Sequence, residues 1–390
     1  MIREVVTGTV DALRRADRSI GQRSGRRTVL VDARTPVNFT MVAPIHRAMA
    51  ADPRVEFYFT ASEEPDRLRE IYREATDVTL LHPSAARRMR FDAYVASDFM
   101  WQSLPRGTCR IQVFHGVGGK YGFDAPTTSM RAWDRIFFVN ERRLTNFVRA
   151  GALDAGSPAI RMVGLPKVDA LVNRAWSRTA VLDSLALDPA RPTLLYAPTW
   201  SPASSLNALG LELVPRLLAT GANVIVKLHD RSRDVRTRYS GGVDWVGRLT
   251  PVLAGRRGVI APGHDISPCL AAADLMITDH SSAGFEYLLL DRPLVRIDRP
   301  ELVSHANIHP DYVALLASVS DSVNSVDGVL AAVDRGLASP DTLSGTRRAV
   351  AADLFYRPGG ATTRAIGHLY DAIDLAPIPA ALAQEAACQP

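Results

Sequence analysis

The chain is poor in the residues that build several common kinds of site. It has three cysteines among 390 residues, and they lie far apart in the sequence, at Cys109, Cys269 and Cys388. An odd, scattered set supplies neither a disulfide framework nor a metal-binding Cys-x-x-Cys pair, so we expect a reducing, cytoplasmic environment and no metal site. No apolar run approaches the roughly 20 residues that span a bilayer, and the N-terminus lacks the apolar core of a signal peptide.

Three motifs of nucleotide and acyl-transfer chemistry are also missing. The sequence has no Asp-x-Asp pair for a metal–nucleotide complex, no Gly-x-x-x-x-Gly-Lys-Ser/Thr phosphate loop and no Gly-x-Ser-x-Gly nucleophile elbow. We therefore expect no cofactor. The charge of a phosphate-bearing ligand would have to be met by Lys, Arg, His and the N-termini of helices.

The cationic side chains are nearly all arginine, and the formal net charge is +5. No nucleic-acid-binding module is recognisable, so an anionic polymer or a membrane surface is the better candidate partner. Residues 1–27 have the pattern of an amphipathic basic helix, with Ile2, Val6, Val10 and Leu13 on one stripe. The same stripe could instead pack against the protein itself. We predict a cytoplasmic protein, with a peripheral position at the inner face of the cell membrane if the stripe binds lipid.

Short β-rich runs alternate with helical segments along most of the chain. The expected strands are 28–32, 55–60, 91–96, 110–114, 135–139 and 160–163, and then 193–197, 223–228, 258–261, 275–278 and 294–297. This alternation predicts two doubly wound, Rossmann-like α/β domains that face each other across a cleft. We expect the domains at 28–170 and 171–355, a helix that crosses back at 356–375 and a loosely ordered tail at 376–390.

The stretch from Asp274 to Pro293 carries the strongest functional signal. A buried strand is expected to lead into Asp279-His280-Ser281-Ser282, and a helix to follow. A strand, a hydroxyl-rich turn and a helix start present free N–H groups and a positive dipole end to a phosphate. Asp279, Ser281 and Ser282 could merely cap the helix, but two serines and a histidine exceed what a cap requires. We predict these three residues, with Arg292 at the far end of the helix, as donor-binding residues.

A histidine follows another strand directly. His115 precedes Gly116 and two further glycines, which let substrate or backbone approach closely, and Lys120 lies just beyond. A histidine in this position suits a general base, since its pKa lies near neutrality. The alternative is a histidine that only makes hydrogen bonds within its loop. We predict Gly116 and Lys120 on the acceptor side of the site.

Two more strands end in polar side chains. Strand alternation places Lys227 and His229 on one side, where two cationic donors could together neutralise a pyrophosphate. A solvated histidine at a strand end is the alternative. Thr199 ends another strand and can donate to a phosphate or sugar oxygen. We interpret His264 as loop structure.

In order, these segments resemble the CDP-glycerol glycerophosphotransferase family, the teichoic-acid primases and polymerases. The matching pieces are Phe114-His115-Gly116, Gly164-Leu165-Pro166-Lys167-Val168-Asp169-Ala170-Leu171, Tyr196-Ala197-Pro198-Thr199-Trp200, Lys227-Leu228-His229-Asp230 and Thr278-Asp279-His280-Ser281-Ser282. The family has proline where this chain has Asp230, and tyrosine where it has His280. After the first histidine, the family's Gly-Thr-Pro-x-Lys-Lys is here Gly-Val-Gly-Gly-Lys-Tyr.

The resemblance implies a GT-B type fold, with an acceptor-side N-terminal domain and a CDP-alditol-binding C-terminal domain. It implies an enzyme that moves glycerol phosphate or ribitol phosphate from a CDP-alditol to a hydroxyl of a lipid-linked or glycan polymer of the cell wall or capsule, and releases CMP. His115 would be the base, and His229, Ser281 and Ser282 would bind phosphate.

Two other interpretations stay open at this point. One is a GT-B glycosyltransferase or sugar-nucleotide epimerase that uses a UDP-sugar, since it would share the serine-rich turn. The other is a non-catalytic nucleotide- or lipid-binding protein, against which the presence of both His115 and His229 argues.

Overall fold

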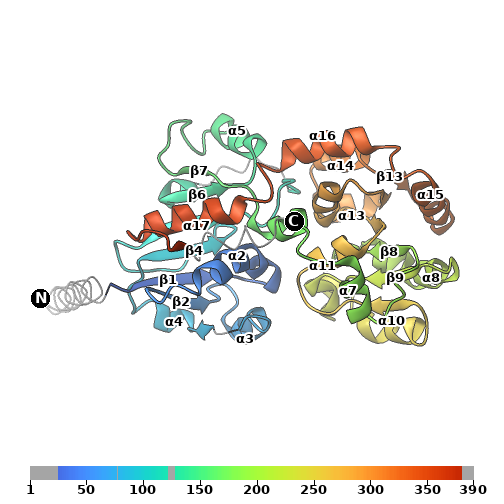
Figure 1. Ribbon diagram of the computed structural model, residues 1–390, viewed down its shortest axis with the longest axis horizontal. Coiled ribbons are helices and arrows are strands. Elements are labelled where there is room, and N and C mark those ends of the chain that lie inside the picture. The colour runs from blue at the N-terminus through green and yellow to red at the C-terminus, as the bar shows by residue number, and fades with distance from the viewer. Residues whose placement is uncertain (1–24, 77, 122–127, 380–390) are drawn as a thin grey trace, which may run out of the picture.

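The computed structural model describes residues 25–76, 78–121 and 128–379. The amphipathic helix predicted over residues 1–27 therefore falls almost wholly outside the described residues, as does most of the predicted tail. Within the described part, the chain forms two parallel β-sheets flanked by helices, which lie side by side in Figure 1.

The first sheet has seven parallel strands in the order β3-β2-β1-β4-β5-β6-β7. They are β1 (Arg27–Asp32), β2 (Val55–Thr60), β3 (Thr79–Leu80), β4 (Ala93–Ser97), β5 (Cys109–Val113), β6 (Arg135–Phe138) and β7 (Ile160–Met162). Every residue of β4 is buried, as expected for a parallel strand covered on both faces. The strand order reverses between β1 and β4, where sheets of this kind bind ligands beyond the carboxyl ends of their strands.

The second sheet repeats this topology with six strands in the order β10-β9-β8-β11-β12-β13. They are β8 (Thr193–Tyr196), β9 (Asn223–Val226), β10 (Gly258–Ile260), β11 (Leu275–Thr278), β12 (Leu294–Ile297) and β13 (Asp321–Val323). All residues of β8, β9, β11 and β12 are buried. The order reverses between β8 and β11, so the turns that follow these two strands flank the second expected binding point.

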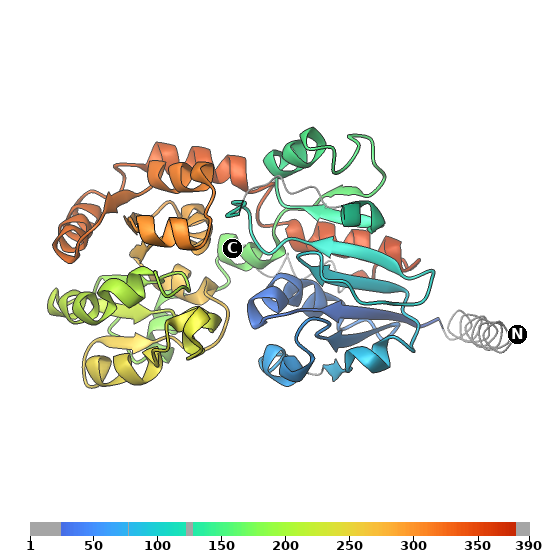
Figure 2. The same ribbon diagram turned by 180° about the vertical axis from the view of Figure 1, so that it is seen from behind.

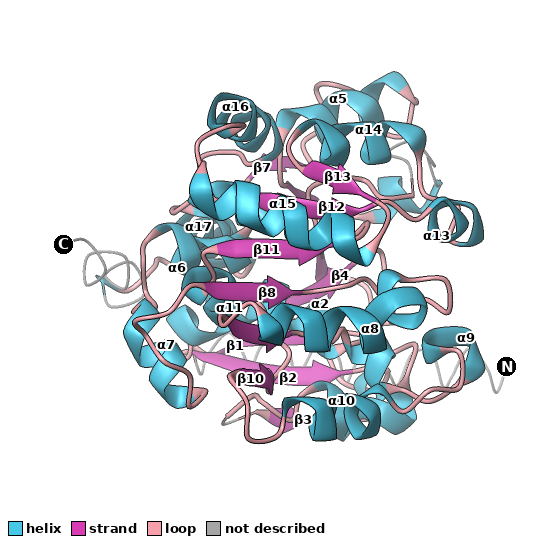
Figure 3. Ribbon diagram, turned by 90° about the vertical axis from the view of Figure 1, so that its right-hand side faces the viewer, coloured by secondary structure: helices cyan, strands magenta, loops and turns pink. Residues whose placement is uncertain are grey.

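Helices cover both sheets. Those of the first half and the connection are α2 (Pro36–Met49), η1 (Pro65–Arg67), α3 (Leu68–Ile71), α4 (Pro83–Ala86), η2 (Thr128–Ala132), α5 (Glu141–Arg149), η3 (Pro166–Val168), α6 (Asp169–Val172) and α7 (Arg178–Ser184). Those that follow are α8 (Ser205–Ala219), η4 (Asp230–Arg233), α9 (Thr237–Ser240), α10 (Trp245–Leu253), α11 (Ser267–Ala272), α12 (Ala283–Tyr287), η5 (Leu288–Leu290), α13 (Pro300–His305), α14 (Pro310–Ser318), α15 (Val326–Ala338), α16 (Ser344–Leu354) and α17 (Ala361–Ala372). Figure 3 shows α8, α10 and α15 along one face of the second sheet.

Local capping fixes two helix starts near the carboxyl edges of the sheets. The side chain of Thr35 accepts a hydrogen bond from the N–H of Asn38, and Pro36 occupies the first turn of α2. The side chain of Ser204 accepts from the N–H of Asn207 at the start of α8. Each cap holds the turn that connects a central strand, β1 or β8, to its helix.

The last helix returns to the first half of the chain. The Asp169 carboxylate accepts hydrogen bonds from the N–H groups of Gly359 and Ala361 at the start of α17. Farther along the helix, the hydroxyl of Tyr370 donates to Asp52 at 3.0 Å. Figure 2 shows α17 lying against the first sheet, so the chain crosses between the two halves twice.

The predicted fold class is confirmed: two doubly wound α/β halves face each other in the GT-B arrangement. Each predicted strand is present, with ends shifted by a residue or two. The strands that were not predicted, β3 and β13, are sheet-edge strands of two and three residues. Such short segments lack the apolar alternation on which the prediction depends.

Candidate active site

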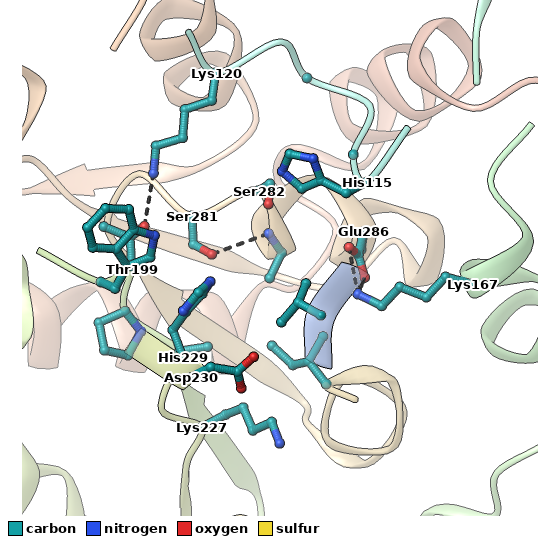
Figure 4. Close-up of a pocket in the computed structure, with 18 of the residues that line it drawn as sticks. His115, Lys120, Lys167, Thr199, Lys227, His229, Asp230, Ser281, Ser282 and Glu286 are labelled. Carbon is teal, nitrogen blue, oxygen red and sulfur yellow. Dashed lines mark hydrogen bonds and ion pairs between the residues drawn. The ribbon is translucent and has the colours of Figure 1, made fainter. Parts of the chain in front are cut away.

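A cavity of about 240 Å³ lies between the two sheets and receives side chains from both. Its walls include the turns that follow β5, β8, β9 and β11. The predicted site residues that line it are His115, Gly116, Lys120, Thr199, Lys227, His229, Ser281 and Ser282. Figure 4 shows most of these side chains converging from opposite walls. The structure thus gathers residues that are separated by more than a hundred positions in sequence.

His115 is paired with a carboxylate from the neighbouring strand. Its Nδ1 atom lies 2.5 Å from Oδ2 of Asp98. Asp98 follows β4 and His115 follows β5, and the two strands are adjacent in the sheet. Asp98 has a φ of 61°, in the left-handed region that costs energy for residues other than glycine. With Nδ1 turned to Asp98, Nε2 is the nitrogen left for the cavity.

The surroundings of Asp98 keep it ionised. Its carboxylate accepts hydrogen bonds from the Asn38 side chain at 3.0 Å and from the backbone N–H of His115 at 3.4 Å. Burial opposes ionisation, but His115, Arg34 and Arg143 together outweigh burial and lower the pKa of Asp98. The sequence analysis missed Asp98. The only available signal was its place at the carboxyl end of a strand, beside the strand that carries His115.

The turn after β11 that contains Ser281 and Ser282, here called the serine turn, opens onto the cavity. The hydroxyl of Ser281 accepts a hydrogen bond from the N–H of Ala283 at 3.4 Å, which is a weak cap. Ser282 occupies the capping position of α12, yet its side chain makes no capping hydrogen bond. Capping therefore accounts for Ser281 in part and does not account for Ser282, which lines the cavity.

Asp279 was predicted to bind the donor, and the structure gives it another position. It is fully buried behind the cavity wall. Its carboxylate accepts from the N–H of Thr199 at 2.8 Å and from both the N–H and the hydroxyl of Ser205. Because its oxygens accept hydrogen bonds from backbone and hydroxyl donors, Asp279 joins the turn after β8 to the end of β11. It holds Thr199 in place and is not among the residues that line the cavity.

His229 is a neutral hydrogen-bond donor, which differs from the cation expected from the sequence. Its Nδ1 atom accepts from the N–H of Arg231 at 3.1 Å. Burial lowers its pKa to about 4, so the ring is uncharged at neutral pH. A neutral ring that accepts at Nδ1 carries its proton on Nε2. His229 can therefore offer an N–H to a phosphate oxygen but adds no positive charge.

All three lysines of the chain line this cavity. Lys227 donates to the carbonyl oxygens of Pro262 and Gly263, so most of its hydrogen-bonding capacity is used within the protein. It was predicted as a donor-binding cation, and it has at most one N–H left for that purpose.

Lys120 is the lysine that keeps its charge available. Its Nζ atom donates to the neutral hydroxyl of Thr199 at 2.9 Å. Burial lowers the pKa of Lys120 to about 8, opposed by the carboxylate of Asp279. Lys120 was predicted on the acceptor side because it follows His115, but its long side chain crosses the cavity to the second half of the chain.

A buried ion pair joins the two halves beside the cavity. Nζ of Lys167, between the two sheets, lies 2.7 Å from Oε2 of Glu286 in α12, and their side chains are 7% and 6% exposed. Removal of either partner would leave an uncompensated buried charge. Sequence analysis did not identify this pair, because the two residues lie 119 positions apart.

Arg292 was also predicted to bind the donor, but it is not among the residues that line this cavity. Its guanidinium donates to the carbonyl oxygens of Ala271 and Ala273 at 2.9 and 2.6 Å. These carbonyls precede β11, at the amino-terminal edge of the sheet. The helix that starts at the serine turn runs back along the sheet and carries Arg292 to the edge opposite the cavity.

Two kinds of feature are not found in residues 25–76, 78–121 and 128–379. No group of three or more His, Cys, Asp and Glu side chains is arranged to hold a metal ion. No helix in these segments has both the length and the apolar content to cross a bilayer.

Comparison with known proteins identifies relatives of this architecture. A search of curated proteins finds no match. Among solved structures, the wall teichoic acid polymerase TagF is 17% identical, with 90% of this chain and 89% of that chain covered and a TM-score of 0.67. A TagF variant soaked with CDPG is 16% identical, with 89% of each chain covered and a TM-score of 0.66. MnaA of S. aureus with UDP is 12% identical, with 90% of this chain and 98% of that chain covered and a TM-score of 0.59.

Identities this low show a shared fold, and the family is established by sequence. The sequence model of the CDP-glycerol:poly(glycerophosphate) glycerophosphotransferase family matches residues 38–302, which is more than half of the 390 residues. The chain therefore belongs to the CDP-glycerol:poly(glycerophosphate) glycerophosphotransferases, a family of phosphotransferase enzymes.

Proposed function

We propose that this enzyme transfers an alditol phosphate from a CDP-alditol to a hydroxyl of a cell-wall or capsule polymer and releases CMP. CDP-glycerol is the first candidate donor and CDP-ribitol the second. The observation that carries the proposal is that His115 and the phosphate-binding candidates Ser281, Ser282 and His229 line one cavity from opposite halves. Phosphoryl transfer requires a base that faces the groups holding the donor phosphates.

In this proposal, residues 28–170 hold the acceptor and residues 171–355 hold the donor. Asp98 keeps Nδ1 of His115 occupied, so Nε2 takes the proton from the acceptor hydroxyl. The acceptor oxygen forms a bond to the β-phosphorus, the bond from that phosphorus to the bridging oxygen breaks, and the electron pair leaves on CMP. General-base catalysis of this kind contributes about 10²–10⁴-fold.

The opposite wall offers groups that suit the leaving CMP. The ammonium of Lys120, the Nε2–H of His229 and the hydroxyls of Thr199, Ser281 and Ser282 supply one positive charge and several neutral donors. Donors that are already in place stabilise developing charge without reorganisation when the bond breaks. These donors support a position for the donor pyrophosphate on the side of the cavity formed by the second half.

The product decides between this proposal and a UDP-sugar enzyme. The purified protein is incubated with CDP-glycerol, CDP-ribitol and UDP-N-acetylglucosamine in the presence of a polyol-phosphate or glycan acceptor, and the released nucleotide is measured. We expect CMP from a CDP-alditol, dependent on acceptor and lost in His115→Ala. Release of UDP from the UDP-sugar, or epimerisation of the UDP-sugar, without formation of CMP would refute the proposal. The similarity to MnaA, at 12% identity, is a similarity of fold and does not favour the UDP-sugar alternative.

We also propose that the enzyme works in the cytoplasm, at the inner face of the membrane, where it meets a lipid-linked acceptor. The apolar stripe Ile2, Val6, Val10 and Leu13 among arginines supports this, at about 1 kcal/mol per basic residue near an anionic surface. Deletion of residues 2–20 should reduce co-sedimentation with anionic liposomes. Equal sedimentation of the truncated and full chains would remove these residues from membrane contact.

A further inference from the structure

The wall of the cavity contains a carboxylate with one oxygen that has no partner. Asp230 follows His229, and its side chain is 7% exposed. Its Oδ1 atom lies 2.6 Å from Nδ1 of His264. Its Oδ2 atom is buried and has no hydrogen-bond partner, although Asp230 lines the cavity (Figure 4). A buried acceptor without a donor is costly, and a ligand that supplies the donor removes that cost.

His264 holds the carboxylate in a fixed orientation. Its Nε2 atom lies 3.6 Å from Oε1 of Glu74, and its backbone N–H donates to Oε2 of the same glutamate at 3.2 Å. Glu74 follows α3 in the first half, so His264 is held between carboxylates of the two halves. With Oδ1 of Asp230 engaged by this histidine, Oδ2 is the oxygen that has no partner.

The charge of Asp230 restricts what it can bind. Burial opposes its ionisation, but the hydrogen bond with His264 and the positive charge of Lys227 act against burial, and the pKa of Asp230 is lowered. An ionised carboxylate only accepts hydrogen bonds, and it repels phosphate. Its complement on a nucleotide-linked donor is therefore a neutral group with a proton to give, such as a hydroxyl, and not the pyrophosphate.

The backbone does not require an aspartate at this position. Residue 230 is the first residue of η4, and His229 before it is extended, with a φ of −66° and a ψ of 152°. The first residue of a helix that follows an extended residue accommodates proline well, and proline is what the family pattern has here. The carboxylate is thus an addition made by this chain, and its removal is compatible with the local fold.

We propose that Oδ2 of Asp230 accepts a hydrogen bond from a hydroxyl of the CDP-linked donor and makes that hydroxyl a determinant of donor choice. This inference rests on the proposed function. The hydroxyl belongs either to the alditol or to the ribose, and the two sources have the same chemistry.

The test measures binding of CDP-glycerol, CMP and 2′,3′-dideoxy-CMP to the wild type and to Asp230→Ala by calorimetry. A lost hydrogen bond to a charged group corresponds to about 10- to 100-fold weaker binding. If the alditol supplies the hydroxyl, only CDP-glycerol loses affinity. If the ribose supplies it, CDP-glycerol and CMP lose affinity equally and the dideoxynucleotide binds both proteins alike. Unchanged binding of CDP-glycerol to Asp230→Ala would overturn the proposal.

Two further variants separate recognition from folding. Asp230→Pro restores the family residue and should reproduce the loss with an unchanged thermal midpoint. Glu74→Gln disturbs His264 from the other side but keeps Oδ2, so it should bind CDP-glycerol as the wild type does. An equal loss in Glu74→Gln would show that Asp230 acts only by holding the loop, which overturns the proposal. If the wild type binds neither CDP-glycerol nor CMP, the proposed function itself fails, and this inference fails with it.

Discussion

Nδ1 of His115 and Oδ2 of Asp98 lie 2.5 Å apart at the ends of two adjacent strands of the first sheet. The pair has the geometry of an imidazole held in one orientation by an ionised carboxylate. A positioning carboxylate matters only through the imidazole it holds, and this dependence can be tested directly.

Asp98→Asn should lower kcat by at least about 10²-fold while the KM for the donor stays near the wild-type value. The asparagine keeps the shape but offers an N–H where the carboxylate accepts one, so it favours the wrong tautomer of His115. His115→Ala should lose at least as much activity. The double variant should be no worse than His115→Ala, and additive losses would show that Asp98 has a separate role.

Lys120 should make donor binding dependent on pH. Its pKa is lowered to about 8 by burial, so the ammonium is present at pH 7 and is lost as the pH rises through 8. Because the charge favours a pyrophosphate, the affinity for CDP-glycerol should fall between pH 7 and pH 9. Lys120→Arg keeps its charge over this range and should flatten the dependence. Lys120→Met should bind about 10- to 100-fold more weakly at pH 7.

Calorimetric titrations with CDP-glycerol at pH 7, 8 and 9 measure these effects. The same fall in affinity in the wild type and in Lys120→Met would assign the pH dependence to another group.

A glycine of the first half makes a close contact with the second half. A Cβ atom on Gly118 would lie 2.7 Å from Cε2 of Phe285 and 2.9 Å from Cε2 of Tyr312, and both rings are fully buried or nearly so. Gly118→Ala should therefore destabilise the protein by about 1–3 kcal/mol, as overpacking does. Gly116→Ala is the matched control, since a Cβ there meets nothing within 4 Å.

Thermal unfolding of the two variants measures the difference. A midpoint for Gly118→Ala equal to that of Gly116→Ala would mean that the aromatic rings move aside at no cost.

The sequence predicted the fold and most of the cavity because these features have local signals. The strand before Ser281 is an unbroken apolar run, and it leads directly into the polar turn. His115 likewise follows a buried strand. Parallel strands bring their carboxyl ends to one edge, so polar residues at those ends meet without further information.

The positions that the sequence did not predict depend on strand pairing, on the packing of the two halves or on the direction of a helix. Asp98 meets His115 only because β4 pairs with β5, and Lys167 meets Glu286 only because the two halves pack together. Arg292 is close in sequence to Ser281 and Ser282 but lies away from the cavity, because the helix between them runs back along the sheet. Residues that are neighbours in the sequence then lie at opposite edges.

His280 should make the stability of the fold sensitive to acid. Its side chain is fully buried, and neither ring nitrogen has a hydrogen-bond partner. Burial lowers its pKa to about 4, against about 6.5 in an unfolded chain. Above pH 6.5 the ring is neutral in both states. Between pH 6.5 and 4 the unfolded chain takes up a proton that the folded chain does not, so stability is lost as the pH falls, by about 3 kcal/mol at most.

His280→Phe removes this titration and keeps a planar apolar ring in the site. His229, whose pKa is also lowered to about 4, titrates in both proteins, so the informative quantity is the difference between them. We expect urea unfolding at pH 7, 6, 5 and 4 to show a smaller loss in the free energy of unfolding for the variant than for the wild type at each lower pH. Two stability curves that stay parallel over this range would show that His280 becomes protonated without cost, through a hydrogen bond to Asp298 or to water that forms as the pH falls.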